Sequence, residues 1–302
     1  MDIKQLERFV AVAQSGSFNR AAQALAVSQP SLTRSIQLLE AATGQALFER
    51  GSRGIELTAI GEELLPRARL IIAERDRALG AVRALAGHGA QTVRIGCDAA
   101  FAMQRLPAAL SEMSRRHPQI CMDVREKPIA DLLEDLRAGQ VSLVFGARGP
   151  ALELGDLVFE QLASESAGVI LHGDHPLARK QRVGLADLVD ARWIVPEHPM
   201  LELGWRAMFA DRDLEVPPIA LRTSSLVLAK ACLLAGGFVS LGDRSIFARE
   251  IEAGQLASLD LGLARYERPT GVFRRPDVRL SQSELSLLQC LEGLSESIYE
   301  YL

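Results

Sequence analysis

Three apolar stripes at helical spacing follow one another in the first 40 residues, and they limit this segment to a bundle of short helices. The stripes are Ile3, Leu6, Val10 and Ala13; then Phe18, Ala21, Ala22 and Leu25; then Leu32, Ile36 and Leu39. Ser17, after Gly16, and Ser28 are the predicted N-caps of the second and third helices, and Pro30 lies in the first turn of the third, where a missing N–H costs little. We therefore predict a helix-turn-helix.

The third stripe leaves a polar face on the opposite side of its helix. If Leu32, Ile36 and Leu39 are buried, that face carries hydroxyl, amide and guanidinium groups. Such groups read base edges and bind phosphates in protein–DNA complexes. The residues of this face are Gln29, Pro30, Thr33, Arg34 and Gln37. The pattern predicts double-stranded DNA as a partner.

The distribution of charge agrees only weakly with that prediction. The whole chain carries a net charge of −4, but residues 1–58 contain six Lys or Arg against five Asp or Glu, which makes this segment +1 and the remainder −5. A segment so weakly basic binds DNA loosely by itself. Tight binding is therefore expected to need more than one copy of the chain.

Two short strand-like runs at residues 47–50 and 54–57 flank a Gly-Ser-Arg-Gly turn. They predict a hairpin wing with Arg53 at its tip and Arg50 beside it. Because so small a hairpin is marginal alone, we expect it to pack on the helices.

Thr58 is the predicted cap of a long helix that runs to about Leu85, in which Pro66 is expected to cause a kink or local unwinding. The apolar residues of this helix form a narrow seam: Leu64, Ala68, Ile71, Ala78, Val82 and Leu85. Such a seam predicts pairing with the same helix of a second copy, and a solvated spacer is the alternative. A flexible hinge is predicted after it.

From Thr92 the pattern changes to alternating strands and helices. Strands are predicted at 93–97, 120–125 and 141–145, with helices at 101–116 and 129–138 between them. This βαβαβ order implies a right-handed parallel sheet. A second unit has strands near 168–171, 193–196, 219–221 and 239–241 and helices near 203–209, 226–235 and 243–253. Residues 272–273 and a closing helix from 281 to about 299 are predicted to return to the first unit.

These patterns predict an α/β chain with an N-terminal winged helix-turn-helix. The predicted parts are residues 1–58 for that domain, 59–86 for the linker helix, 87–91 for the hinge, and 92–302 for a domain of two α/β lobes, one formed by about 92–162 and 267–302 and the other by about 163–266. Two lobes joined by two crossovers leave a cleft at the carboxyl ends of parallel strands, where open sheets bind small ligands.

The residues predicted to line this cleft follow strands or begin helices. They are Asp98, Ala99, Phe101, Pro128 and Gly146 in the first lobe, and Glu197, His198, Met200, Thr223, Ser224 and Gly242 in the second. Helix N-termini and hydroxyls favour an anionic or hydroxylated ligand. Asp98 and Glu197 disfavour a carboxylate, so an organic acid, a sugar-like molecule and a ligand with a positive group all stay open. For each residue a cap or turn role is the alternative.

The cysteines and histidines form no pattern typical of a metal or disulfide site. The scattered Cys97, Cys121, Cys232 and Cys290 are expected to be buried thiols, with a redox role for Cys97 as the alternative. The run from His172 to His175 is interpreted as a turn. We therefore predict no metal and no cofactor.

Catalytic and membrane functions are not indicated either. The chain has no nucleophile elbow, phosphate loop or HExxH motif, and it is predicted not to be an enzyme. No stretch is apolar and long enough to span a bilayer, and Met1 leads into an amphipathic helix rather than a signal peptide. A cytoplasmic protein without membrane contact is expected.

Along its whole length the chain resembles the LysR-type transcriptional regulators. The resemblance is carried by residues 6–13, 16–18, 21–22, 25, 27–33, 36–40, 44, 47–50 and 57–62, and more weakly by the His-Pro-Leu-Ala run at 175–178. It implies a winged helix-turn-helix, a dimerising linker helix, and an effector domain similar to type 2 periplasmic binding proteins. It also implies control by a small-molecule effector and dimers that pair into tetramers, with RNA polymerase as a further candidate partner.

The resemblance also implies roles for individual residues. The major-groove contacts would come from Gln29, Pro30, Ser31, Thr33, Arg34 and Gln37. Arg53 would reach a minor groove from the wing, and Arg50 would lie near a phosphate. The chain departs from the family at Leu241-Gly242-Asp243, where many members have Leu-Pro.

Two other functions stay open from the sequence. One is the same kind of regulator without a small-molecule ligand, responding to a protein or to oxidation. The other is a small-molecule-binding protein or enzyme whose function resides in residues 92–302.

Overall fold

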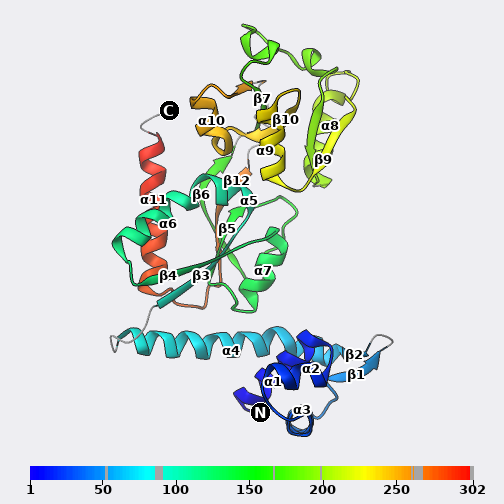
Figure 1. Ribbon diagram of the computed structural model, residues 1–302, viewed down its shortest axis with the longest axis vertical. Coiled ribbons are helices and arrows are strands. Elements are labelled where there is room, and N and C mark those ends of the chain that lie inside the picture. Colours follow the sequence, from blue (N-terminus) through cyan, green and yellow to red (C-terminus); the bar gives the residue numbers. More distant parts are fainter. Residues whose placement is uncertain are drawn as a thin grey trace.

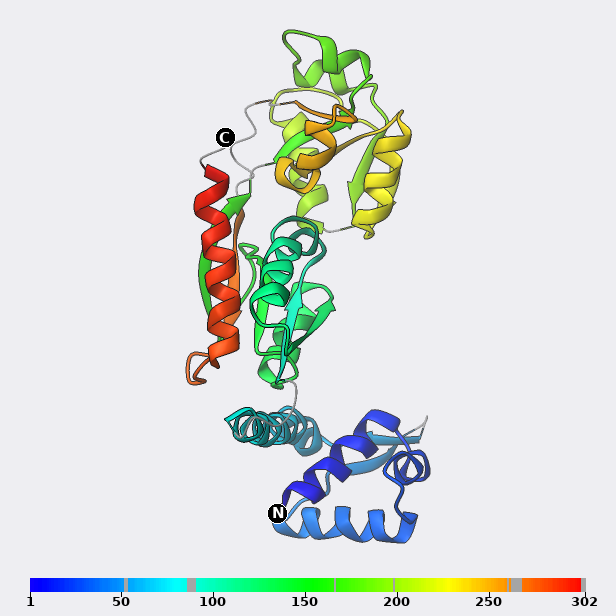
Figure 2. The same cartoon turned by 60° about the vertical axis from the view of Figure 1, so that its left-hand side comes forward.

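The computed structural model describes residues 1–51, 54–85, 91–165, 167–197, 199–259, 261 and 268–299. From one end to the other it consists of a small helical domain, a long helix, and two α/β lobes (Figures 1 and 2). The helical domain and the two lobes each have a cluster of buried apolar side chains.

The N-terminal domain packs three helices against a hairpin. Its elements are α1 (Ile3–Ser15), α2 (Phe18–Ala24), α3 (Gln29–Thr43), β1 (Phe48–Gly51) and β2 (Gly54–Leu57). Ser17 accepts a hydrogen bond from Arg20 N, and Ser28 accepts one from Ser31 N, so both predicted N-caps are confirmed. The strands of the wing pair antiparallel. Phe48 of β1 packs its ring 5.3 Å from that of Phe9, which anchors the wing on the helices.

The long helix α4 (Ala59–Leu85) begins at Thr58, whose Oγ1 accepts a hydrogen bond from Gly61 N at 3.1 Å. It remains helical through Pro66, so the expected local unwinding is not observed. Its first half packs on the N-terminal domain, where Ala68 is fully buried. Arg75 of α4 pairs with Glu7 of α1 at 2.5 Å.

Lobe one is a five-stranded sheet in the order β4-β3-β5-β12-β6. Its elements are β3 (Gln91–Cys97), α5 (Ala99–Gln104), α6 (Leu106–Arg116), β4 (Ile120–Glu126), α7 (Ile129–Arg137), β5 (Leu143–Ala147), β6 (Val158–Glu165), β12 (Arg268–Arg274) and α11 (Gln282–Tyr299). As predicted, β3 pairs parallel with β4 and β5, and the chain returns through β12 and α11. The sequence pattern does not predict β6.

The helix predicted at 101–116 is wrong as a single element. The structure ends α5 at Gln104 and begins α6 at Leu106, with Pro107 in its first turn. Proline cannot donate the hydrogen bond that would continue the earlier helix, and its ring clashes with the preceding turn. The apolar spacing alone does not reveal this break.

Lobe two is a second five-stranded sheet, in the order β11-β7-β10-β8-β9. Its elements are β7 (Ala167–His172), η1 (Pro176–Arg179), η2 (Leu185–Leu188), β8 (Trp193–Pro196), α8 (Pro199–Ala210), β9 (Ile219–Thr223), α9 (Leu226–Ala235), β10 (Val239–Asp243), η3 (Arg244–Phe247), α10 (Ala248–Glu252) and β11 (Leu256–Leu259). The helix predicted at 243–253 is therefore a 3-10 turn followed by a short α-helix, and β11 is an additional strand. Trp193, Trp205 and Phe209 form the buried aromatic centre, with ring centroids 5.7–5.9 Å apart.

The two lobes touch through α5 of lobe one and η3 of lobe two. Ala100 and Met103 of α5 pack against the lobe two cluster that contains Ile246 and Phe247. The carboxyl ends of β3, β4 and β5 lie at one edge of the sheet, and α5 starts from the same edge.

Among the described residues, no helix is long and apolar enough to cross a membrane, and no group of three His, Cys, Asp or Glu could hold a metal ion.

Candidate nucleic-acid interface and effector site

The two faces of α3 differ sharply in exposure. Leu32, Ile36 and Leu39 are each 2% exposed or less, which confirms the predicted buried stripe. Thr33 on the other side is half-buried, and the remaining predicted DNA contacts on α3 are exposed: Gln29, Pro30, Ser31, Arg34 and Gln37. A row of hydroxyl, amide and guanidinium groups is thus presented to solvent. The contacts with DNA themselves stay a prediction.

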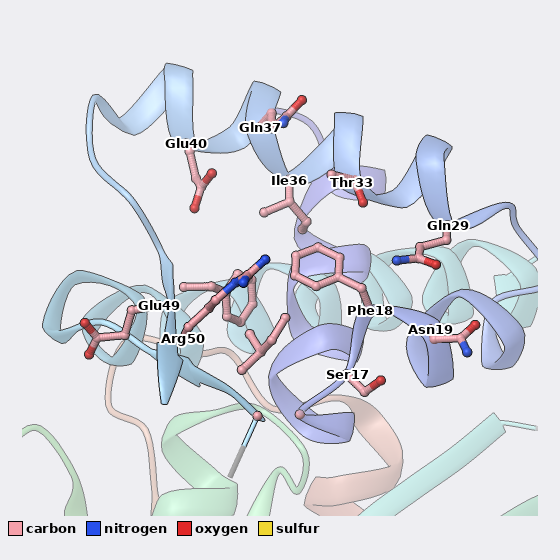
Figure 3. Close-up of a pocket in the computed structure, with 14 residues that line it drawn as sticks. Ser17, Phe18, Asn19, Gln29, Thr33, Ile36, Gln37, Glu40, Glu49 and Arg50 are labelled. Carbon is pink, nitrogen blue, oxygen red and sulfur yellow. The ribbon is translucent and has the colours of Figure 1, made fainter. Parts of the chain in front are cut away.

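A hollow of about 590 Å³ separates α3 from the wing. Figure 3 shows Gln29, Thr33 and Ile36 of α3 facing Phe18 and Arg50 across it. Apolar side chains, among them Phe18 and Ile36, and polar ones, among them Arg50, line it together. This shape suits a strand of sugar and phosphate lying between the reading helix and the wing.

Hydrogen bonds between side chains and the backbone hold the wing in place beside α3. Glu40 Oε1 accepts a hydrogen bond from Leu47 N at 2.8 Å, so the last turns of α3 are tied to the start of the wing. Thr58 donates from Oγ1 to Ala46 O at 2.7 Å, and it also caps α4. The position of the wing is therefore set by α3 and by the start of α4.

The start of α2 belongs to this surface, although the sequence pattern did not place it there. Ser17, Phe18 and Asn19 line the hollow, and Asn19 is exposed. The signal that could have found these residues is the cap at Ser17, because a helix N-terminus offers unpaired N–H groups to an anion.

On the wing, Arg50 is exposed and lines the hollow, while Arg53 lies outside the described residues. Two carboxylates, Glu40 and Glu49, also line the hollow. Glu40 is occupied by its bond to Leu47, and Figure 3 shows Glu49 directed away from Arg50.

The predicted seam of α4 divides into two groups. Leu64 and Ala68 pack in the core of their own N-terminal domain. Ile71, Ala78 and Val82 are exposed, Ile71 to 39% and Val82 to 64%. The side chain of Leu85 lies outside the described residues. Only the exposed group is accessible to a second copy.

At the carboxyl edge of lobe one, Asp98 is engaged by its own chain. Its Oδ1 accepts from Phe101 N at 2.7 Å, capping α5, and its Oδ2 accepts from Ala147 N at 3.0 Å. A Cβ at Gly146 would lie 2.5 Å from that second oxygen, so glycine is needed beside it. The carboxylate ties the end of β3 to the end of β5.

The other lobe one residues that are predicted to line the cleft differ in accessibility. Ala99 is half-buried in the first turn of α5, and Pro128 is exposed at the start of α7. Phe101 is 1% exposed and stacks on Phe145 at 5.2 Å in the core. Its position after a strand suggests a cleft residue, but its ring is directed into the lobe, which argues against ligand contact.

The lobe two residues that are predicted to line the cleft lie at the ends of β8, β9 and β10. Glu197 is exposed, and its N–H donates to Thr223 O at 3.0 Å. Thr223 Oγ1 in turn accepts from Ser225 N, and Ser224 is exposed. Gly242 has Phe247 so close that a Cβ would meet its ring at 2.7 Å. His198 and the side chain of Met200 lie outside the described residues.

The expectation of four buried thiols is wrong for two of them, because Cys121 on β4 is exposed and Cys232 on α9 is only half-buried. The other two thiols, Cys97 and Cys290, are protected in lobe one. Burial, together with the charges of Asp98 and Glu126, raises the pKa of Cys97 to about 12. Burial also raises the pKa of Cys290, which packs in the same core.

In lobe two, the pKa of His175 is lowered from its ordinary value. Burial is the larger cause, and the charge of the nearby His172 is the smaller one.

A winged helix-turn-helix with an exposed polar reading helix, joined by a long helix to two α/β lobes, defines a DNA-binding regulator with a ligand-binding type of domain. Residues 3–62 match the family described as bacterial regulatory helix-turn-helix protein, lysR family, and residues 86–295 match the LysR substrate binding domain. The chain therefore belongs to the LysR family of transcriptional regulators, as the resemblance predicted.

Individual relatives agree over nearly the whole chain. It is 33% identical to the SDS degradation transcriptional activation protein of a Pseudomonas species, with 93% of this chain and 92% of the relative covered. It is 27% identical to the transcriptional regulator GalR of Pseudomonas putida, with 95% and 72% covered. Among solved structures, full-length CbnR in complex with its target DNA matches with a TM-score of 0.67 and 25% identity, covering 97% of this chain and 99% of that one.

Proposed function

We propose that the exposed face of α3 reads operator DNA in the major groove. The observation that carries this proposal is the exposure of Gln29, Arg34 and Gln37 over a buried stripe, on a domain of the LysR helix-turn-helix family. Pro30, Ser31 and Thr33 lie on the same helix and complete the contact. Arg50 binds a phosphate, and Arg53 reaches the minor groove.

A selection experiment tests this proposal. The full-length protein is incubated with a pool of random duplexes, and the retained DNA is amplified and sequenced. We expect one enriched sequence with repeated half-sites, because a domain with so little net charge needs two or more contacts to bind tightly. A pool that stays random at low salt contradicts the proposal.

We further propose that copies of the chain assemble as dimers and tetramers, and that RNA polymerase is a partner. Exposed apolar side chains on α4, Ile71 and Val82, support pairing of the linker helices. On α9, Val227 is 70% exposed and Leu228 46%, which supports a second contact between copies. Ile71→Asp is expected to shift sedimentation toward smaller species, whereas Arg179→Asp on the surface of lobe two is not.

The effector is proposed to be a small molecule bound between the two lobes, at the strand ends that carry Asp98 and Glu197. Because both oxygens of Asp98 accept backbone N–H groups, those donors are not free for the carboxylate of an organic acid. A sugar-like or positively charged ligand fits better. A thermal-shift screen of the full chain with neutral sugars, amines and organic acids tests this class, and stabilisation by the acids alone contradicts it.

A redox-responsive regulator has less support than one that binds a small molecule. Cys97 and Cys290 are buried, with thiol pKa values raised above the ordinary range, so neither provides a reactive thiolate. Cys121 and Cys232 are more accessible, but they lie on different lobes, on β4 and on α9. No specific observation favours a regulator that responds to a partner protein, or an enzyme. Since the relatives are transcriptional regulators, we propose a non-enzymatic protein that acts in the cytoplasm without cofactor or metal.

The division of labour proposed for the chain follows these roles. Residues 1–58 bind DNA, residues 59–86 link and pair the copies, and residues 92–302 bind the effector. The hinge is proposed at residues 87–91, of which 87–90 lie outside the described residues and Gln91 is already the first residue of β3.

A further inference from the structure

The linker helix α4 is joined to lobe one by the chain, and it also packs against lobe one through non-covalent contacts. Both views of the molecule show α4 lying across the base of lobe one (Figures 1 and 2). We define the linker seat as the residues of this contact: Leu70, Ala73 and Arg77 of α4, and Gly139, Arg275 and Glu284 of lobe one.

Gly139 lets the backbone of lobe one touch α4. It follows α7 with a φ of +66°, and a Cβ placed on it would lie 2.8 Å from Ala73 Cβ and 3.1 Å from Leu70 Cδ1. Any other residue would therefore be strained in its own backbone and would push α4 away. The two surfaces are in contact without a side chain of residue 139 between them.

Glu284 links α4 to the closing helix of lobe one. Its side chain is 6% exposed, and its Oε1 lies 3.6 Å from Arg77 Nη2. The other oxygen accepts from Ser281 N at 2.6 Å, and Ser281 Oγ accepts from Glu284 N, so the same carboxylate caps α11. The charge that receives Arg77 is thus held in one orientation.

The neighbouring charges are also enclosed. Arg275 is 7% exposed, and its pKa is lowered by burial and by Arg77, against the opposing effects of Glu74, Asp277 and Glu284. Arg77 Nη1 is buried without a hydrogen-bond partner among the described residues. Charges in such a place depend strongly on their partners, because an unpaired buried charge is destabilising.

On its other side α4 is fixed to the DNA-binding domain. Ala68 is buried in that domain, and Arg75 pairs with Glu7 of α1. One helix is therefore held by the DNA-binding domain and by lobe one at the same time. A change in the angle between α4 and lobe one must move α3 with it.

We propose that the linker seat is the joint through which lobe one sets the direction of the DNA-reading helix, and thereby the half-site spacing that an assembly of copies accepts. The inference rests on the proposed function, since it requires copies that bind repeated half-sites. With the seat intact, each α3 points in one direction and one spacing is favoured. With the seat broken, the chain connection alone holds the domains, and several spacings bind equally well.

The test uses the duplex enriched by the full-length protein, remade with its half-sites moved apart by single base pairs, together with a duplex carrying one half-site. We expect wild-type affinity to depend on spacing, and Gly139→Ala to reduce that dependence by about fivefold or more. Affinity for the single half-site stays unchanged. The control is Gly254→Ala, which has a φ of +70° with nothing within 4 Å and so shares the backbone strain without touching α4.

A folded Gly139→Ala protein whose affinity depends on half-site spacing as the wild type does would contradict the proposal that the linker seat sets this spacing. Failure of the wild type to bind any enriched duplex would instead contradict the proposed function, so the two failures are distinguishable.

Charge variants give a second test that does not alter the backbone. Arg77→Met removes the cation, and Glu284→Gln removes the charge but keeps an oxygen for Ser281 N–H. Each is expected to reduce the spacing dependence, and the double variant no further than the stronger single one, because both break the same contact. Two full effects that add together, or none at all, would contradict the assignment.

Discussion

The reading face of α3 and the carboxyl edge of lobe one are both predicted binding surfaces, yet they are built differently. On α3, burying Leu32 and Leu39 leaves Arg34 and Gln37 between them exposed, and the small Ser35 is buried with the apolar stripe. At the edge of lobe one, Asp98 is occupied by backbone N–H groups and Phe101 by the core. A helical stripe determines which side chains face solvent, whereas a place after a strand does not.

The largest effect expected from this difference is in thiol reactivity. Cys97 lies at the end of a strand, as Asp98 does, but its pKa near 12 makes its thiolate about a thousandfold rarer at neutral pH than that of a thiol at 9.0. Iodoacetamide at a pH of about 7.5, well below that raised pKa, should leave Cys97 unmodified in the folded protein and alkylate it in urea. Peptide mass spectrometry measures both, and rapid alkylation of Cys97 without urea would place it in an open site.

Next in size is the stability of lobe one. Phe101→Ala is expected to lower the free energy of unfolding by about 3–5 kcal/mol, because it leaves a cavity against Phe145. Leu203→Ala, at a side chain 60% exposed on α8, is the control and should change stability by less than about 0.5 kcal/mol. Urea unfolding decides this, since equal stabilities would mean that Phe101 serves the ligand and not the core.

Asp98 is expected to contribute to the stability of lobe one through its two hydrogen bonds. Asp98→Ala removes the cap of α5 and the bond to Ala147, and it should cost about 1–2 kcal/mol of unfolding free energy even without ligand. Glu197→Gln, at an exposed carboxylate in lobe two, should have little effect. If the two variants were equally stable, Asp98 would be free to bind an effector.

The smallest effect is expected on the wing. Arg50→Ala should weaken binding to all DNA sequences alike and reduce the slope of log affinity against log salt by about 1. The measurement is a salt titration of binding to the enriched duplex. A change confined to one base pair would show that Arg50 reads sequence instead of phosphate.

The sequence predicts well the features that depend on neighbouring residues, and it predicts poorly those that depend on contacts between distant segments. The caps Ser17 and Ser28 and the buried stripe of α3 depend on neighbours within four residues, so periodicity reveals them. The additional strands β6 and β11 and the inward position of Phe101 depend on packing against distant segments. The break before Leu106 is local, but it is marked by Pro107 and not by the apolar spacing. Ala68 shows the same limit, since its seam position is occupied by its own domain rather than by a second copy.

Base-resolved binding of Arg34→Ala shows whether the exposed side of α3 reads the operator. Affinities of wild type and variant are measured for the enriched duplex and for each of its single-base variants. Arg179→Ala, a 74% exposed cation of lobe two, controls for the lost charge.

We expect Arg34→Ala to lose about 1–3 kcal/mol of binding free energy and to stop discriminating at one base pair, while Arg179→Ala behaves as wild type. Unchanged affinity and unchanged discrimination in a folded Arg34→Ala protein would show that the exposed side of α3 does not read the operator.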